Sequence, residues 1–256
     1  MAAEAQFDTI AKHYDLLYGD RDDDLAMWED LTDQVEGEIL EVGCGTGRVM
    51  IPLLQRGHRV TGIEISPLAL QTAQAKLDLG RLSDRASLHL ADMRTFSLPQ
   101  KQFSFAFLPI NTFMHCQTTT DQQATLATIY HHLQPGGRLV VDLFHPSPQM
   151  LLASDGELLL EQQRLDELTG QTTQWFISRR LQLAEQRQEV IFILDEIDQN
   201  GLVRRETISF SLRYLHRFEL TLLLNQAGFR VLETLGDYDQ SEFDDLSPRI
   251  ISIAEK

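Results

Sequence analysis

The chain has 256 residues, of which 43% are hydrophobic, which is enough apolar material for a large core in one α/β domain with an elaboration. Its formal net charge of −16 argues against a general surface for nucleic acid or anionic membrane, because phosphate binding needs clustered lysine and arginine. We therefore expect no nucleic-acid partner.

The cysteines and the N-terminal residues indicate in which cellular compartment the protein is expected. Cys44 and Cys116 form no C-x-x-C motif, and the first residues lack the basic and apolar regions of a secretory leader. No apolar run reaches the length of a membrane span. These features predict a cytoplasmic protein with no disulfide and no membrane partner.

Two helices are predicted before the first strand. Apolar residues at helical spacing, with Tyr14 and Tyr18 near the end, predict an amphipathic helix over residues 7–18. The aspartates at 22–24 would supply the N-cap of a helix over 25–35. We expect no metal there, because consecutive acids usually face solvent. Residues 1–36 are thus predicted to form an N-terminal helical cap.

Residues 39–48, Ile-Leu-Glu-Val-Gly-Cys-Gly-Thr-Gly-Arg, predict a buried strand, a tight turn and a helix start. The dinucleotide motif G-x-G-x-x-G needs a glycine where Arg48 stands, and the Gly-Lys-Ser/Thr of a P-loop is missing. Glu41, just before the glycines, would also repel a phosphate. The loop therefore favours a ligand with a cation and an amino group, such as S-adenosylmethionine.

Residues 41–47 resemble the first motif of the class I S-adenosylmethionine-dependent methyltransferases. Three further segments resemble later parts of that family, in the same order and at suitable spacing: 59–64, 88–93 and 133–141. The resemblance implies an α/β fold with a Rossmann-like seven-stranded sheet of order 3-2-1-4-5-7-6, the last strand antiparallel. It also implies S-adenosyl-L-methionine as the cofactor.

The same resemblance assigns roles to individual residues. Glu64 would accept from the ribose hydroxyls, Asp92 from the adenine amino group, and Met93 would cover the adenine ring. Glu41 would help to hold the methionine ammonium, and a tyrosine-bearing helix would fold over the cofactor, although both tyrosines also suit plain packing. The cofactor-binding residues expected are Tyr14, Tyr18, Glu41, Gly43, Cys44, Gly45, Thr46, Gly47, Glu64, Ile65, Asp92, Met93, Pro109 and Asn111.

The remaining core elements follow from local signals. A helix is predicted over 46–56, where Pro52 indicates either a kink or a later start. Ser66 followed by Pro67 is a start signal for a second helix, running to about residue 79. Further elements are expected as strands over 86–91, 103–108, 137–143, 230–235 and 249–254 and as helices over 119–133 and 213–226. The core would comprise residues 37–154 and 213–256.

The strand over 103–108 delivers residues 109–115 to the carboxyl edge of the sheet, where ligands bind in open α/β folds. Methyltransferases of nucleic-acid bases carry an Asp/Asn/Ser-Pro-Pro-aromatic motif or a nucleophilic cysteine there, and this chain has neither. We therefore expect a small-molecule acceptor, shaped by Asn111 and His115. His115 and Tyr14 are the candidate general bases, but His115 also fits a loop histidine facing water.

Three extended segments, 171–181, 189–197 and 202–212, are rich in β-branched and aromatic residues, and an Asn-Gly pair predicts a hairpin between the last two. They resemble the antiparallel insert of sugar and glycine N-methyltransferases, which covers the acceptor site and often builds a dimer. We expect an insert over 155–212 and a possible homodimer through it. Arg213 and Tyr214 would reach the acceptor where the insert rejoins the core.

The predicted activity is methyl transfer to nitrogen or oxygen of a small molecule by in-line displacement. Two alternatives stay open: a module of this fold that binds cofactor without catalysis, and a nicotinamide oxidoreductase, against which Arg48 argues.

Overall fold

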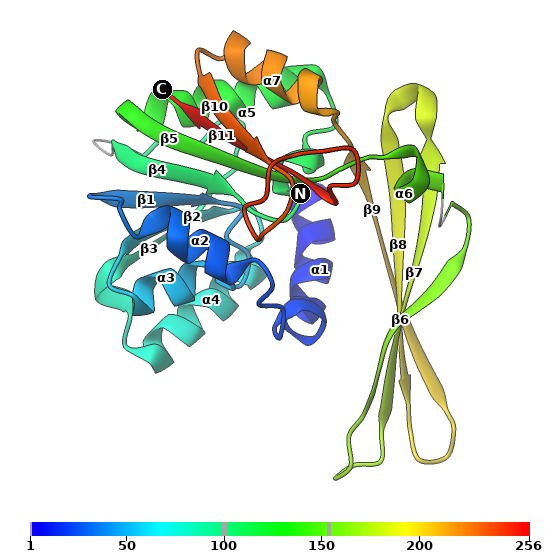
Figure 1. The fold of residues 1–256 in the computed structure, drawn as a ribbon. Helices are drawn as coiled ribbons and strands as arrows, with labels where there is room; N and C mark the ends of the chain where they lie inside the picture. The colour runs from blue at the N-terminus through cyan, green and yellow to red at the C-terminus, as the bar shows by residue number, and fades with distance from the viewer. Residues whose placement is uncertain (1, 99–101, 153–154) are drawn as a thin grey trace. The chain divides into compact units, whose positions relative to one another are not determined.

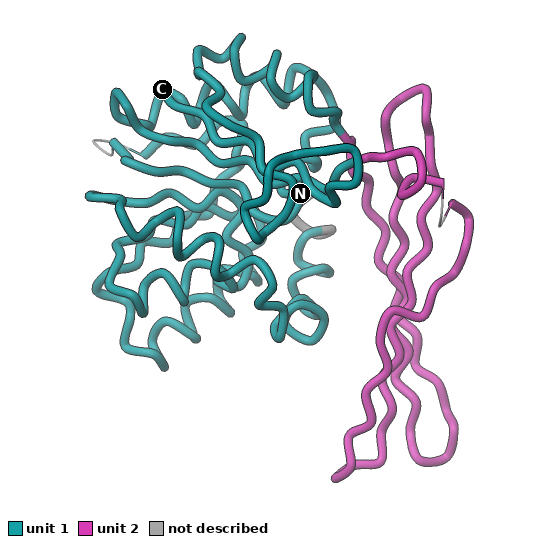
Figure 2. The backbone as a smooth tube through the Cα atoms, in the orientation of Figure 1, with its two compact units in different colours: residues 1–145, 215–256 teal, residues 146–214 magenta. Residues whose placement is uncertain are grey.

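The computed structural model describes residues 2–98, 102–152 and 155–256 (Figure 1). The chain divides into two compact units, drawn in different colours in Figure 2. The core unit comprises residues 1–145 and 215–256, and the insert unit comprises residues 146–214. Among the described helices, none combines the length and the apolar character needed to cross a membrane.

The core unit is built on one seven-stranded sheet of order β10-β11-β5-β4-β1-β2-β3. Its five parallel strands are neighbours in the order that the sequence predicts, and β11 runs antiparallel between β5 and β10. The predicted sheet is therefore confirmed. The strands are β1 Glu38–Val42, β2 Arg59–Glu64, β3 Ala86–Leu90, β4 Phe103–Leu108, β5 Leu133–Phe144, β10 Arg230–Leu235 and β11 Arg249–Glu255.

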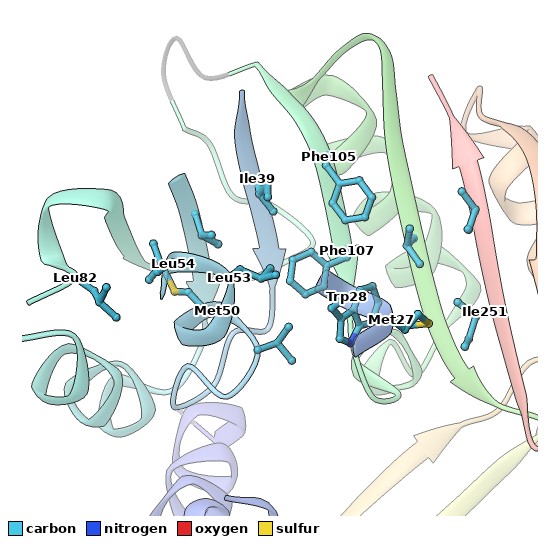
Figure 3. Close-up of a cluster of buried hydrophobic side chains, with 14 of the residues drawn as sticks. Met27, Trp28, Ile39, Met50, Leu53, Leu54, Leu82, Phe105, Phe107 and Ile251 are labelled. Atoms are coloured by element: carbon cyan, nitrogen blue, oxygen red, sulfur yellow. The ribbon is translucent and has the colours of Figure 1, made fainter. Parts of the chain in front are cut away.

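Helices cover the sheet, and side chains on both sets of alternating strand positions are buried. One cluster joins α2 and α3 to the sheet, with the rings of Trp28 and Phe107 tilted by 34° and their centroids 4.7 Å apart (Figure 3). Leu40 and Ala106, whose side chains point to the face of the sheet opposite to that of Ile39 and Phe105, are also fully buried. The helices of this unit are α1 Ala2–Tyr18, α2 Leu25–Thr32, α3 Met50–Gln55, α4 Pro67–Gly80, α5 Thr119–His132 and α7 Arg217–Gln226, with short 3-10 turns η1 Ser83–Arg85 and η2 Thr112–His115.

Local capping and turn signals account for several helix starts. Ser66 caps α4 by accepting from the Ala69 amide at 3.0 Å, and Pro67 occupies the first turn, as predicted. Helix α3 starts late, at Met50, so that Pro52 lies in the first turn, where its missing N–H breaks no helical hydrogen bond. The helix predicted to open at Arg213 is wrong there, because Arg213 pairs with Arg187 in a strand and α7 begins at Arg217.

The insert unit is a four-stranded antiparallel sheet in simple sequence order, preceded by a short helix. The predicted Asn-Gly hairpin is confirmed: Gly201 has φ +80°, and the Asp198 carboxylate accepts from the Asn200 and Leu202 amides. The first strand was not predicted, because its leucine, glutamine and arginine residues favour helix and only pairing with the next strand defines it. The elements are α6 Pro148–Leu152, β6 Leu158–Leu165, β7 Thr172–Gln182, η3 Leu183–Glu185, β8 Arg187–Ile197 and β9 Val203–Arg213.

Candidate functional site

The three glycines after β1 all have left-handed backbone, with φ +77° at Gly43, +54° at Gly45 and +85° at Gly47. Only glycine adopts this conformation without strain. A Cβ on Gly43 would lie 2.5 Å from Cγ2 of Thr112, whereas a Cβ on Gly45 would meet nothing within 4 Å. Gly43 is thus required by packing, while the main chain at Gly45 is open to a ligand.

These two glycines make a matched pair for mutation. Gly43→Ala is expected to lower the free energy of unfolding by about 1–3 kcal/mol more than Gly45→Ala, because both create backbone strain but only the first also clashes. Urea unfolding of the two variants measures the difference. Equal losses would contradict the packing role of Thr112 against Gly43.

The side chain of Glu64, at the end of β2, is hydrogen-bonded to the glycine loop. Its Oε2 accepts from the Gly45 amide at 3.0 Å, and its Oε1 accepts from the amides of Ile65 and Ser66 at 2.8 and 2.9 Å. Burial raises the pKa of Glu64, and the three amides oppose that shift. A carboxylate has about four acceptor positions, so the oriented group keeps capacity for a further hydroxyl donor.

Asp92 follows β3 at the same edge of the sheet. Its carboxylate pairs with Arg94, through Nε at 2.9 Å and Nη2 at 2.5 Å, and Arg94 also reaches Asp121 at 2.9 Å. The Arg94 guanidinium lowers the pKa of Asp92, so the group is a carboxylate at neutral pH. Met93 is half-buried beside it. The adenine-binding role of both residues stays a prediction.

Glu41 precedes the glycine loop on β1 and Arg48 follows the loop, and Glu41 is only 2% exposed. Arg48 is held by Asp24, with Nη1–Oδ1 and Nη2–Oδ2 distances of 2.6 Å, and the Trp28 indole donates to the same carboxylate at 3.0 Å. Sequence reasoning missed this pair. Asp24 stands at the N-cap position of α2, but its fully buried carboxylate caps no amide, so the predicted N-cap and solvent-facing roles are wrong for it.

Two aspartates of helix α1 accept hydrogen bonds from the loops that follow β1 and β2. The Asp15 carboxylate accepts from Thr46 Oγ1 at 2.6 Å and from Lys76 Nζ at 2.8 Å. The Asp8 carboxylate accepts from Ser66 Oγ at 2.5 Å. Neither aspartate was singled out from the sequence, because their partners lie 31 to 61 positions away.

The two predicted tyrosines contact each other on this helix, with the rings of Tyr14 and Tyr18 tilted by 44° and their centroids 5.1 Å apart. Burial raises the pKa of Tyr14, so its hydroxyl stays protonated at neutral pH. This environment weakens the case for Tyr14 as a general base, while leaving its ring available for packing against a ligand.

The turn after β4 has unusual backbone geometry: Ile110 and Asn111 have φ +39° and +62°. A β-branched residue in this region is strained. The turn is held by Asp142 of β5, whose Oδ2 accepts from the Ile110 amide and whose carbonyl accepts from the Asn111 amide, each at 2.9 Å. Asn111 Oδ1 accepts from the Phe144 amide at 2.7 Å, so this oxygen serves the turn itself.

Asp142 is in turn held by residues near the end of the chain. Its buried carboxylate pairs with Arg249 of β11, whose Nε lies 2.8 Å from Oδ1, and it accepts from the Tyr238 hydroxyl at 3.2 Å. The Arg249 guanidinium lies 5.0 Å from the Tyr238 ring centroid. Sequence analysis did not single out these three residues. The signal available was an aspartate within an apolar strand, which requires a buried partner.

His115 ends the η2 turn and packs edge-on against Phe7 of α1, with centroids 5.0 Å apart. Burial lowers the pKa of His115 to about 4. The half-buried ring is therefore neutral at physiological pH, and its lowered pKa makes it a weaker base than a free imidazole.

The lowered pKa has a measurable consequence. His115 binds its proton more weakly in the folded chain than in the unfolded chain, so its contribution to stability is lost as the pH falls from about 6.5 toward 4. We expect His115→Gln to flatten that part of the curve of unfolding free energy against pH. Denaturant unfolding of both proteins at several pH values tests this. Parallel curves would contradict it.

Arg213 and Tyr214 belong to the insert unit. Arg213 ends β9 opposite Arg187 of β8, and the Tyr214 amide donates to the Gln186 carbonyl at 2.9 Å. Tyr214 is buried, and burial raises its pKa. Their predicted contact with the acceptor stays a prediction. Among the described residues, no group of three or more His, Cys, Asp or Glu side chains is arranged to hold a metal ion.

Comparison with known proteins adds independent information. Residues 39–137 match the methyltransferase-domain family. Over 136 residues the chain is 34% identical to a dTDP-3-amino-3,4,6-trideoxy-alpha-D-glucopyranose N,N-dimethyltransferase of Streptomyces venezuelae, covering 50% of this chain and 54% of that protein. It is 30% identical over 122 residues to the putative methyltransferase YqeM of Bacillus subtilis (strain 168), covering 47% and 48%. The chain thus spans about half the length of these curated relatives.

A solved structure is similar over nearly the whole length. The CcbJ methyltransferase of Streptomyces caelestis superposes with a TM-score of 0.84 and 25% sequence identity, covering 97% of each chain. The matched domain and the order of the sheet agree with each other. Together they show that residues 39–137 match a methyltransferase domain and that the core unit has the Rossmann-like sheet of methyltransferases.

Proposed function

We propose that this chain is a methyltransferase that uses S-adenosylmethionine and methylates a nitrogen or oxygen of a small molecule. The observation that carries the proposal is the glycine loop, which is open at Gly45 and backed by the buried Glu41, whose Oε2 has no hydrogen-bond partner within the described chain. Such an oxygen fits a ligand that brings an ammonium group. When bound, the cofactor supplies a methyl group already activated on a sulfonium.

The chain's own residues then have defined tasks. Glu64 would accept from ribose hydroxyls with a carboxylate already oriented by three amides, and Asp92 would accept from the adenine amino group. The loop glycines allow a close approach to the main chain. Since the methyl group needs no further activation, the protein mainly orients the reactants and excludes water.

An acceptor nitrogen must be unprotonated when it attacks, and a hydroxyl must lose its proton. His115 is neutral above about pH 4 and lies on the η2 turn directly after β4, at the carboxyl edge of the sheet. We propose it as the group that takes this proton. Asn111, Arg213 and Tyr214 are the further residues proposed to contact the acceptor.

For the acceptor, we favour an amine carried on a sugar. The support is the relative from Streptomyces venezuelae, which is named as an N,N-dimethyltransferase of an amino sugar nucleotide. The acidic chain and the missing base-methylation motif disfavour nucleic acid.

The test is an activity screen with labelled methyl donor over amino sugars, simple amines, amino acids and hydroxylated controls, following formation of S-adenosylhomocysteine. We expect turnover with an amino sugar and little with the matching sugar that carries a hydroxyl at the same carbon. Binding of the donor without turnover on any acceptor would favour a cofactor-binding module instead.

Assembly and compartment complete the proposal. We propose a homodimer through the antiparallel insert, to be tested by analytical ultracentrifugation of the intact chain, where a purely monomeric species would overturn it. A reducing cytoplasmic compartment is supported by the two cysteines, which are both free and buried.

A further inference from the structure

The turn between β4 and η2 has a backbone that its own residues do not favour. Ile110 and Asn111 have φ +39° and +62°, and for the β-branched Ile110 this left-handed backbone is an outlier. Strained residues of this kind persist only where surrounding contacts fix the backbone, and they cluster at active sites and ligand clamps. The contacts that fix this turn therefore bear on function.

The turn lies between the glycine loop and the proposed acceptor residues. On one side, Thr112 packs so closely on the loop that a Cβ on Gly43 would lie 2.5 Å from its Cγ2. On the other side, η2 continues from the turn to His115, and the Met114 amide donates to the Asn111 carbonyl at 2.8 Å. A shift of the turn would therefore move the acceptor residues relative to the loop.

Asp142 holds the turn with a carboxylate that is fully occupied within the protein. Its Oδ2 accepts from the Ile110 amide at 2.9 Å and from the Tyr238 hydroxyl at 3.2 Å. Its Oδ1 accepts from Nε of Arg249 at 2.8 Å and also from Nη2 of the same side chain. A carboxylate has about four acceptor positions, and these four donors fill them. The carboxylate therefore serves the turn rather than a substrate.

Arg249 and Tyr238 hold that carboxylate from the C-terminal part of the chain. The side chain of Arg249 is 10% exposed and that of Asp142 is fully buried, so the ion pair is shielded from solvent. Nη2 of Arg249 also lies 3.5 Å from Oδ1 of Asn111, and the Tyr238 ring centroid lies 5.0 Å from the guanidinium. Arg249 thus acts on the turn both directly and through Asp142.

We propose that Arg249 and Tyr238 are positioning residues for methyl transfer, which act through Asp142 to hold the turn and the acceptor residues of η2 in their reactive arrangement. The role rests on the proposed function, because it needs His115 and Asn111 at the acceptor. Contact with the reacting atoms is not required, since a displacement of about 1 Å caused by a distant substitution can slow a reaction about 100-fold.

The residues proposed to hold the donor have contacts of their own. Glu64 is held by three backbone amides, and Asp92 pairs with Arg94. In the described part of the chain, no hydrogen bond joins either acid to Arg249 or Tyr238. Substitutions of Arg249 and Tyr238 should therefore slow turnover and leave the affinity for the donor unchanged.

The experiment compares Tyr238→Phe, which removes only a hydroxyl, with Arg249→Lys, which keeps the charge but loses the planar fork of donors. The acceptor probe is 3-amino-3-deoxy-D-glucose at saturating S-adenosylmethionine. We expect kcat/KM for the sugar to fall about tenfold in Tyr238→Phe and about 100-fold in Arg249→Lys. Titration calorimetry should give a Kd for S-adenosylhomocysteine within about twofold of that of the unchanged chain.

A second measurement needs no acceptor. His115 packs edge-on against Phe7, so the chemical shift of its ring protons depends on that contact. With S-adenosylhomocysteine bound, both substitutions should move the NMR signal of the His115 ring, because η2 is no longer fixed. The signal of His132, at the end of α5, should stay in place.

Matched controls change the same groups elsewhere in the core unit. Tyr130→Phe removes a tyrosine hydroxyl on α5, and Arg230→Lys alters an arginine of β10 that pairs with Glu255 at the surface. Both controls should behave as the unchanged chain in every measurement. If circular dichroism shows that Arg249→Lys is unfolded, Tyr238→Phe decides alone, because it loses a single hydroxyl.

The outcomes separate the two proposals. An unchanged kcat/KM or an unmoved His115 signal would overturn the positioning role and leave the proposed function standing. A loss of donor affinity as large as the loss of kcat/KM would also overturn it, because the effect would then be general. If the unchanged chain does not methylate this sugar, the His115 signal decides alone. Absence of any binding of S-adenosylhomocysteine would overturn the proposed function itself.

Discussion

Asp24→Ala is expected to lower the free energy of unfolding by about 3–5 kcal/mol, the largest effect we expect from any single substitution in this chain. The side chain of Arg48, directly after the glycine loop in the sequence, is only 6% exposed, and Asp24 is its bidentate partner. Removing the carboxylate leaves a buried guanidinium without a counter-charge, and it also removes the acceptor of the Trp28 indole. Chemical denaturation of the variant and the unchanged chain measures the loss.

A matched control is available two residues away. Asp22 is exposed, so Asp22→Ala should change stability by less than about 0.5 kcal/mol. Replacing both members of the pair by apolar residues, as in Asp24→Leu with Arg48→Met, should recover much of the stability, because no charge is then left unpaired. A mild effect of Asp24→Ala alone would show that Arg48 finds another partner.

Glu64→Ala is expected to weaken S-adenosylmethionine binding by about 2 kcal/mol, roughly 30-fold, which is the scale of lost charge-assisted hydrogen bonds. The carboxylate is both the proposed ribose acceptor and the acceptor of the Gly45, Ile65 and Ser66 amides. The substitution therefore removes a ligand contact and loosens the glycine loop together. Titration calorimetry measures the affinity.

Two controls separate these contributions. Asp84→Ala removes an exposed acid and should leave the affinity unchanged. Glu64→Gln keeps one carbonyl oxygen for the amides but loses the charge, so its affinity should fall between the other two. Unchanged affinity in Glu64→Ala would end the assignment of this residue to the ribose.

Several turns and helix starts were predictable because they depend on residues that are close together in the sequence. Turn chemistry at Asn200-Gly201 and the Ser66-Pro67 start signal act over a few residues, and the structure confirms both. The order of the sheet was implied by the family that the successive motifs resemble, and the structure confirms it. The strand β6 was not predicted, because its amino-acid composition favours a helix and only hydrogen bonding to β7 makes it a strand.

The sequence by itself thus determined the glycine loop and the acids that follow the first strands, since hydrophobic periodicity and backbone conformation are local properties. The order of the sheet came from the resemblance to a known family. Only the tertiary structure decided which buried charges meet. Asp24 pairs with Arg48 across 24 positions, and Asp142 pairs with Arg249 across 107. A carboxylate in a sequence is compatible with solvent, a cap or a buried partner, and the choice depends on the free energy of desolvation, which the fold alone fixes.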